Sequence, residues 1–275
     1  MVSALTKRGD DGLVAGMTEW NASGYEQVSA LQKMLADDAL ASLKLAGTEQ
    51  ILDIGCGDGR ITAEVAKRVT RGSVLGVDPS RNMIEYAQQR FKPTEYPNLK
   101  FAMGDARTLN YRAEFDLVIS FNALHWVHEQ ETALRGIRAA LKPGGRTLLR
   151  FVCQGPRKNI EAVNEETALS PRWVKFFVNR RAPFLHFTPE GYRALLPGAG
   201  LKELSMNLMD SAWDFKTRKG FTTWANVTFV PWTQYLPKEE TAAFIADSLD
   251  HYARVAGDEH TFKYYQLTVV TASKA

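Results

Sequence analysis

A short glycine-rich stretch carries the strongest chemical signal in this 275-residue chain. It reads Asp53-Ile-Gly-Cys-Gly-Asp-Gly59 and joins an apolar run to a helix that we expect to begin near Arg60. Glycine suits such a turn because it adopts left-handed backbone angles and lets a ligand approach bare backbone. The first amides of the following helix favour an anionic group such as a carboxylate. Gly55, Gly57 and Asp53 are therefore predicted to belong to a cofactor site.

Two further polar groups follow the next two predicted strands. Asp78 ends the strand expected at 73–77, where its carboxylate can accept hydrogen bonds from both hydroxyls of a ribose. Asp105 and Ala106 follow the strand expected at 99–103, and the Asp105 carboxylate can accept a hydrogen bond from an adenine amino group. Three such elements after three consecutive strands predict a nucleoside-binding site, whereas a lone glycine-rich turn is weak evidence.

A nicotinamide or flavin dehydrogenase is the main alternative for this pattern. Its fingerprint, Gly-x-Gly-x-x-Gly, also follows the first strand and also has an acidic residue after the second. Here the third glycine, Gly59, comes one residue earlier, and the strand carries Asp53 where dinucleotide-binding folds usually stay apolar. The spacing therefore disfavours a dehydrogenase.

Predicted strands alternate with predicted helices from residue 50 to residue 152. This order is typical of an α/β protein with a doubly wound, mostly parallel sheet, and we count seven strands in all. The segment 156–187 lacks strand alternation and is predicted to be a helical cap insertion. The domain organisation is then a loose leader at 1–18, a cofactor-binding core at 19–155, the insertion, and a C-terminal part at 188–275 that completes the sheet.

Composition narrows the class of protein. The net charge is only +3, from 34 basic and 31 acidic side chains, so no general attraction to nucleic acid is expected. No apolar run is long enough to span a membrane, and the N-terminus lacks a signal peptide. Two distant cysteines indicate a reducing, cytoplasmic location. No metal site is expected, because the histidines have no ligands at suitable spacing.

Four motifs together resemble the class I methyltransferases that use S-adenosylmethionine (AdoMet). They are Asp53–Gly59, Val77-Asp-Pro-Ser80 with Met83, Gly104-Asp105-Ala106, and Leu141-Lys-Pro-Gly-Gly145. The resemblance covers about residues 20–153 and implies a seven-stranded sheet whose last strand is antiparallel. It implies AdoMet as the cofactor and places Met83 over one face of the adenine.

The residues after the fourth strand resemble a smaller group that methylates carboxylates, acting on trans-aconitate and on juvenile hormone acid. Phe121-Asn-Ala-Leu-His-Trp-Val-His128 carries this resemblance, together with Trp20-Asn-Ala-Ser-Gly-Tyr25 and Ser29-Ala-Leu-Gln32. It implies that Gln32 and Trp126 hold the acceptor carboxylate through neutral N–H donors. Trp20, Tyr25 and Phe121 are assigned to the cofactor. The Asn-Pro-Pro-Tyr type of motif found in many methyltransferases of amino groups is absent from this position.

Several alternatives stay open at this point. His125 is a candidate general base for a hydroxyl acceptor, and amine or carbon acceptors are also possible. A non-catalytic AdoMet-binding module is the alternative from another class.

The stretch 171–181 has four basic residues, three aromatic residues and no acid. It predicts either a solvated amphipathic helix or a contact with an acidic, partly apolar small-molecule acceptor, and it gives poor support for RNA binding. Glu161, Glu165 and Glu166 are expected to balance this charge at the surface.

Overall fold

The structure, a computed structural model, describes residues 31, 34–35, 37, 40–41 and 43–273. The predictions for Trp20, Tyr25 and Gln32, and for the leader at 1–18, lie outside the described residues. The described residues between 31 and 41 are helical, and two of them, Leu31 and Leu35, are buried.

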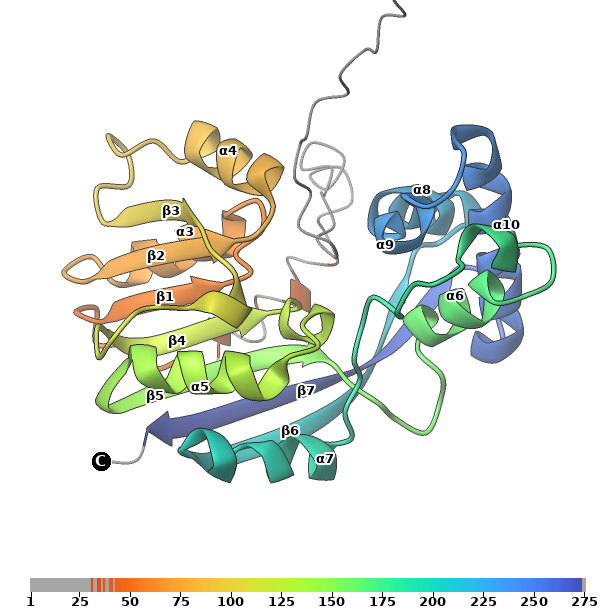
Figure 1. Ribbon diagram of the computed structural model, residues 1–275. Coiled ribbons are helices and arrows are strands. Elements are labelled where there is room, and N and C mark those ends of the chain that lie inside the picture. Colours follow the sequence, from red (N-terminus) through yellow and green to blue (C-terminus); the bar gives the residue numbers. More distant parts are fainter. Residues whose placement is uncertain (1–30, 32–33, 36, 38–39, 42, 274–275) are drawn as a thin grey trace, which may run out of the picture.

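Seven strands form one sheet in the order β3-β2-β1-β4-β5-β7-β6 (Figure 1). Neighbours from β3 to β5 pair in parallel, whereas β7 pairs antiparallel with both β5 and β6. The predicted fold class, a doubly wound and mostly parallel sheet with an antiparallel last strand, is thus confirmed. The strands are β1 (Gln50–Ile54), β2 (Ser73–Asp78), β3 (Leu99–Met103), β4 (Phe115–Phe121), β5 (Leu141–Val152), β6 (Leu201–Asp214) and β7 (Thr261–Ser273).

Eight α-helices from α3 to α10 and four short 3-10 turns connect the strands in the part of the chain from residue 43 to residue 273. The helices are α3 (Arg60–Arg68), α4 (Arg81–Arg90), α5 (Gln130–Ala140), α6 (Ile160–Ala168), α7 (Pro189–Leu195), α8 (Arg218–Thr228), α9 (Val230–Thr233) and α10 (Lys238–Ala256), of which α9 is a single turn. The 3-10 turns are η1 (Ala106–Thr108), η2 (Leu124–Trp126), η3 (Val174–Phe176) and η4 (Pro197–Ala199).

Two predicted boundaries were wrong. The sequence pattern of residues 217–236 predicts a single helix, but the structure breaks it between α8 and α9, where Pro231 has no backbone N–H to continue the helical ladder. The sequence pattern also predicts a strand at 147–152, whereas β5 begins six residues earlier, at Leu141, so the Pro-Gly-Gly segment lies within β5. A register shift beside Phe115 in β4 accommodates this segment.

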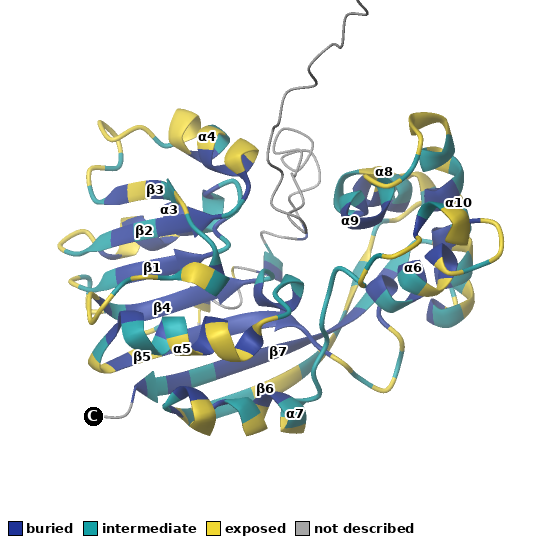
Figure 2. Cartoon of the chain, in the orientation of Figure 1, coloured by how far each residue is buried: buried dark blue, intermediate teal, exposed yellow. Residues whose placement is uncertain are grey.

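Helices cover both faces of the sheet because successive residues of a buried strand point to opposite faces. Ile51 of β1 packs in the core that α3 and α4 close, whereas its neighbour Leu52 packs in the core under α5 and α7. The strands of the central sheet are correspondingly buried along their length, as Figure 2 shows. The sheet is therefore a rigid base, and the loops after its parallel strands can hold side chains in fixed positions.

The helices α6, α8, α9 and α10 gather in a lobe beside the ends of the long strands β6 and β7 (Figure 1). This lobe has its own core, rich in aromatic side chains, with Trp173, Phe221 and Phe244 among its fully buried members. The expected insertion contributes α6 to it. The boundaries predicted for the insertion and for the other parts of the chain stay predictions.

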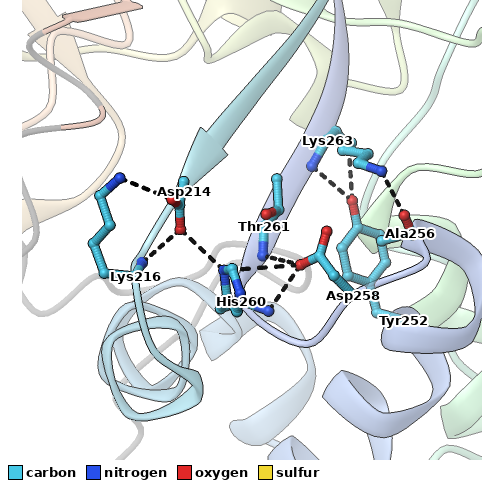
Figure 3. Close-up of polar contacts among 8 residues, drawn as sticks. All are labelled: Asp214, Lys216, Tyr252, Ala256, Asp258, His260, Thr261 and Lys263. Carbon is cyan, nitrogen blue, oxygen red and sulfur yellow. Dashed lines mark hydrogen bonds and ion pairs between the residues drawn. The ribbon is translucent and has the colours of Figure 1, made fainter.

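Polar contacts hold the lobe to the sheet at the turn between α10 and β7 (Figure 3). The Asp258 carboxylate accepts backbone hydrogen bonds from His260 and Thr261, and the His260 ring contacts Asp214 at the end of β6 at 3.0 Å. The Tyr252 hydroxyl of α10 donates to the carbonyl of Lys263 and accepts from its amide. These bonds fix how the longest helix of the lobe leaves the sheet.

Candidate cofactor and acceptor site

The glycine-rich turn after β1 has the backbone that its sequence predicts. Gly55, Gly57 and Gly59 all have positive φ angles, of 72°, 53° and 79°. Gly59 is the N-cap of α3, so the turn leads directly into the first amides of that helix. The turn is also tied to β2, since the amides of Gly55 and Cys56 both donate to the carbonyl of Val77, at 2.8 and 3.1 Å.

Two of these glycines differ in what an added side chain would meet. A Cβ at Gly55 would collide with the Cβ of Ala123, so this glycine permits the close approach of the loop that follows β4. A Cβ at Gly57 would meet no protein atom within 4 Å, and Gly57 lines a cavity. The space in front of Gly57 is thus left free for a ligand.

Asp78 supports the turn and faces the same cavity. Its carboxylate accepts hydrogen bonds from the amides of Gly57, at 3.0 Å, and Ser80, at 2.9 Å. A carboxylate has about four lone-pair positions, so it can accept from ligand hydroxyls as well. Asp78 therefore links the glycine turn to the wall of the cavity, and its contact with a ribose remains a prediction.

A cavity of about 780 Å³ runs along this edge of the sheet. It is bordered by the glycine turn, by α3 and α4, and by the loop after β4. The predicted site residues that line it are Gly55, Gly57, Asp78, Met83, Phe121 and Trp126. Three others that were assigned to the cofactor do not line it: Asp53, Asp105 and Ala106.

Asp53 lies behind the turn rather than in the cavity. Its buried carboxylate accepts a hydrogen bond from the Thr62 hydroxyl of α3 at 2.7 Å. Burial, reinforced by the nearby charge of Asp78 and opposed by the Thr62 hydrogen bond, raises the pKa of Asp53 to about 7. In this structure Asp53 thus connects β1 to α3, the helix that follows the glycine turn.

The raised pKa predicts a pH-dependent stability. Between about pH 4 and pH 7 the folded protein keeps a proton on Asp53 that the unfolded chain has released, so stability falls as pH rises through this window. Asp53→Asn removes this loss. We expect its free energy of unfolding, relative to that of the wild type, to rise by on the order of 2–4 kcal/mol between pH 4 and pH 8. Urea unfolding without cofactor measures the difference.

Asp116→Asn is the matched control for this comparison. Lys142 and the amide of Gln50 hold the pKa of Asp116 below its usual range, although its partial burial opposes them. Asp116 therefore stabilises the fold above about pH 4, and its loss should lower stability at neutral pH and matter less in acid. A pH-independent difference between Asp53→Asn and the wild type would contradict the argument.

Asp105 and Ala106 lie at the next strand end, outside the cavity. Both Asp105 oxygens are engaged by the Arg107 guanidinium, with a contact of 2.9 Å from Nε, and the Asp105 side chain caps η1 by accepting from the Arg107 amide. Ala106 is buried against the core under α5. A contact of these two residues with adenine remains a prediction.

A second, smaller chamber of about 80 Å³ adjoins the cavity and shares Asn122 and Trp126 with it. Five aromatic side chains of the lobe and of β7 belong to its wall: Trp224, Phe229, Trp232, Phe262 and Tyr264. No Lys or Arg lines the chamber among the described residues. The chamber is therefore a pocket rich in aromatic side chains and without a cationic side chain among the described residues, and it adjoins the cofactor cavity at the loop after β4.

His125 lines this smaller chamber beside Trp126, with their ring centroids 4.7 Å apart. Complete burial, with a smaller contribution from His186, holds the pKa of His125 well below its usual range. The imidazole is thus neutral at pH 7 but is a weak proton acceptor. This arrangement gives little support to a general base at His125.

Sequence reasoning missed most of the chamber. Asn122 has a positive φ of 54°, and its side chain accepts a hydrogen bond from Gln266 of β7 at 2.6 Å. An Asn directly after a strand is a weak signal for such a position, because Asn tolerates left-handed angles. Glu161 and Asn164 of α6 also line the chamber, so the expected surface position of Glu161 was wrong.

The stretch 171–181 differs from both of its predicted roles. It contains only the short turn η3 in place of a helix, and Trp173 and Phe177 are buried in the core of the lobe. Arg172 pairs with Asp247 at 2.8 Å and Arg180 with Glu165 at 2.7 Å. None of its residues lines either cavity.

The residues of the large cavity fit AdoMet. The open space at Gly57 accommodates a ligand against bare backbone, the start of α3 suits a carboxylate, and Asp78 suits ribose hydroxyls. Met83 is buried and lines the cavity from α4, where its side chain offers an apolar surface to a base. The chain thus supplies one group for each part of this cofactor.

Comparison with known proteins agrees with this site. Residues 51–145 match a family model described as a methyltransferase domain. The chain is 28% identical to trans-aconitate 2-methyltransferase of Deinococcus radiodurans, over 82% of this chain and 87% of that protein. It is 25% identical to juvenile hormone acid O-methyltransferase of Drosophila melanogaster, over 83% and 81%.

A solved structure shows the same fold. It is phosphoethanolamine N-methyltransferase 2 of Haemonchus contortus in complex with S-adenosyl-L-methionine, with a TM-score of 0.60 and 16% identity over 92% of this chain and 57% of that chain. With the fold and the cavity, these comparisons identify the protein as a class I AdoMet-dependent methyltransferase. The predictions of class and cofactor are therefore confirmed.

Asp78→Ala should weaken AdoMet binding by about 1–3 kcal/mol, because a charged acceptor for ribose hydroxyls is lost. Isothermal titration calorimetry measures the dissociation constant. Asp116→Ala is the control, since Asp116 also accepts a backbone hydrogen bond, from Gln50 at 2.8 Å, but does not line the cavity. Equal affinities of the Asp78 variant and the wild type would remove Asp78 from the cofactor site.

Proposed function

We propose that this methyltransferase forms methyl esters on a carboxylate of a small acceptor that is acidic and partly apolar. The observation that carries the proposal is the aromatic chamber that joins the cofactor cavity at Asn122 and Trp126. An acceptor that reaches through this junction has its apolar part in the chamber and its reacting end towards the cavity.

The chemistry of the chamber favours an acceptor that needs no base. When bound, AdoMet supplies an electrophilic methyl group on a positively charged sulfur. A carboxylate is already ionised at neutral pH, whereas a hydroxyl or an ammonium must first lose a proton. His125, with its lowered pKa, is poorly suited to remove one.

Trp126 is the residue that we assign to the acceptor. It is half-buried and lines both the cavity and the chamber. A neutral indole N–H can orient a carboxylate without neutralising it, so the nucleophilic oxygen keeps its charge. Gln32, the second group assigned to the carboxylate, lies outside the described residues and stays a prediction.

The relatives support the same class of acceptor. The names of the Deinococcus radiodurans and Drosophila melanogaster proteins refer to trans-aconitate and to juvenile hormone acid, and both of these acceptors are carboxylic acids. We extend the class of acceptor to this chain, but not the particular acid. The cytoplasmic location, the absence of a nucleic-acid partner and the cofactor roles of Trp20 and Tyr25 stay predictions. No helix in the described part of the chain has the length and apolarity to cross a membrane.

Product analysis tests the proposal. The protein is incubated with AdoMet that carries a labelled methyl group and with a panel of saturated and unsaturated carboxylic acids. We expect labelled methyl esters, which mild base hydrolyses to release labelled methanol. A labelled product that is stable to mild base would show an ether, amine or carbon acceptor instead. Binding of AdoMet without transfer to any acceptor would favour a non-catalytic binding module.

A further inference from the structure

One corner of the aromatic chamber is polar and has no function in the site described so far. Glu161 and Asn164 lie one turn apart on α6, and Trp224 lies on α8. All three line the chamber, and their exposed fractions are 7%, 0% and 6%. A surface helix does not normally turn a glutamate and an asparagine into an aromatic core.

Polar atoms of this corner lack partners within the described residues. They are one Glu161 carboxyl oxygen, both amide atoms of Asn164 and the indole N–H of Trp224. A buried polar group without a partner costs about 1–3 kcal/mol, and all three residues that carry these atoms line one small chamber. The shared location indicates that a ligand group completes their hydrogen bonds.

We propose that Glu161, Asn164 and Trp224 form a recognition subsite for an uncharged oxygen-bearing group, a hydroxyl above all, at the far end of the acceptor. This inference rests on the carboxylate acceptor proposed above and adds a second recognised group to it. The chamber, at about 80 Å³, admits one end of an acceptor rather than a whole molecule.

The mixture of donors and acceptors selects a hydroxyl over an ammonium group. Trp224 can only donate, Asn164 both donates and accepts, and the Glu161 carboxylate accepts. A hydroxyl has lone pairs for the indole N–H and a proton for an oxygen of Glu161 or Asn164. An ammonium group has only donors, so it would leave the Trp224 N–H without a partner.

The charge state of Glu161 agrees with an uncharged group. No Lys or Arg among the described residues lines the chamber, so no cation there balances a negative charge on Glu161. Burial raises the pKa of Glu161 to about 7, so its protonated form is available as a donor at neutral pH. The other titratable side chains that line the chamber are Tyr264 and His125, and burial holds the pKa of His125 well below its usual range.

Three matched ligands test the subsite. They are a saturated monocarboxylic acid, the acid of equal chain length with a terminal hydroxyl, and the acid with a terminal ammonium group, each taken through a series of chain lengths. Calorimetric titration into the protein saturated with S-adenosylhomocysteine measures binding without turnover. At the best chain length we expect the hydroxy acid to bind on the order of 10-fold more tightly than the plain acid.

Substitutions link this preference to the corner. Glu161→Leu should abolish the hydroxyl preference, whereas Glu161→Gln, which keeps hydrogen-bonding capacity, should retain most of it. Glu166→Gln is the control, because Glu166 lies on the same helix but pairs with Lys158 at the surface at 2.6 Å. Trp224→Phe gives an independent test that does not depend on the folding of a Glu161 variant.

The outcomes separate this inference from the proposed function. Tighter binding of the acid with the ammonium group, or of the plain acid, would overturn the subsite. So would a failure of all three acids to bind. Equal binding with methyl ester formation would overturn the subsite and leave the proposed function intact. A hydroxyl preference with methyl transfer to an atom outside the carboxylate would overturn the proposed function and leave the subsite intact. A 100-fold fall in kcat with unchanged binding in Glu161→Gln would assign Glu161 as a general base instead.

Discussion

Gly57→Ala is expected to lower the affinity for AdoMet on the order of 100-fold, about 3 kcal/mol. The added methyl group meets no protein atom within 4 Å and enters open space beside the cavity that Gly57 lines, where we expect the cofactor to bind. The folded protein should tolerate the change, at a cost of about 1 kcal/mol for alanine at a φ of 53°. Calorimetric titration gives the affinity, and urea unfolding gives the stability.

Gly144→Ala is the matched control for this variant. Gly144 also has a positive φ, of 75°, and an added Cβ there also meets nothing within 4 Å. It lies at the start of β5, at the end of the sheet away from the cavity. Both variants should lose similar stability, but only Gly57→Ala should lose cofactor affinity. Equal affinities in the two variants would mean that the turn does not hold the cofactor.

The cofactor half of the site was predictable because its geometry is local. The turn from Asp53 to Gly59 needs positive φ angles at three positions, and glycine supplies them. Asp78 is placed by the parallel pairing of β1 with β2, which brings both strand ends to one edge. Local sequence and strand order are enough to predict both features.

Asp53 and Asp105 show where this reasoning ended. Both lie near the carboxyl end of a strand, at the edge of the sheet that carries the cavity. Yet Thr62 binds the carboxylate of Asp53, and Arg107 binds the carboxylate of Asp105. The sequence gives the strand end to which a side chain belongs. Which neighbour its carboxylate contacts depends on packing that a one-dimensional pattern does not contain.

The chamber that we propose for the acceptor was harder to predict because distant segments form it. Asn122, Asn164, Trp224 and Gln266 come from the loop after β4, from α6, from α8 and from β7, and they meet only when the lobe packs on the sheet. Glu161 looks like a surface residue of a charged helix, and only this packing buries it. The aromatic residues in the stretch 171–181 are also placed by the packing of the lobe, which they stabilise, and they line neither cavity.

Trp126→Phe is expected to lower kcat/KM for a carboxylate acceptor on the order of 10- to 100-fold while changing the AdoMet dissociation constant less than about twofold. Phenylalanine keeps an aromatic ring beside Trp232, whose centroid lies 6.2 Å away, but removes the indole N–H. The loss should therefore fall on the group that orients the acceptor. Steady-state kinetics with the best acid of the panel, together with a titration of AdoMet, separate the two quantities.

Trp213→Phe on β6 is the control, because Trp213 is also half-buried against the lobe but lines neither cavity. It should leave both quantities near their wild-type values, so a general loss of lobe packing would affect the two variants alike. The opposite pattern in Trp126→Phe, weaker AdoMet binding with unchanged turnover at saturation, would place the indole against the cofactor. Since Trp126 lines both the cavity and the chamber, this comparison decides which of the two ligands it binds.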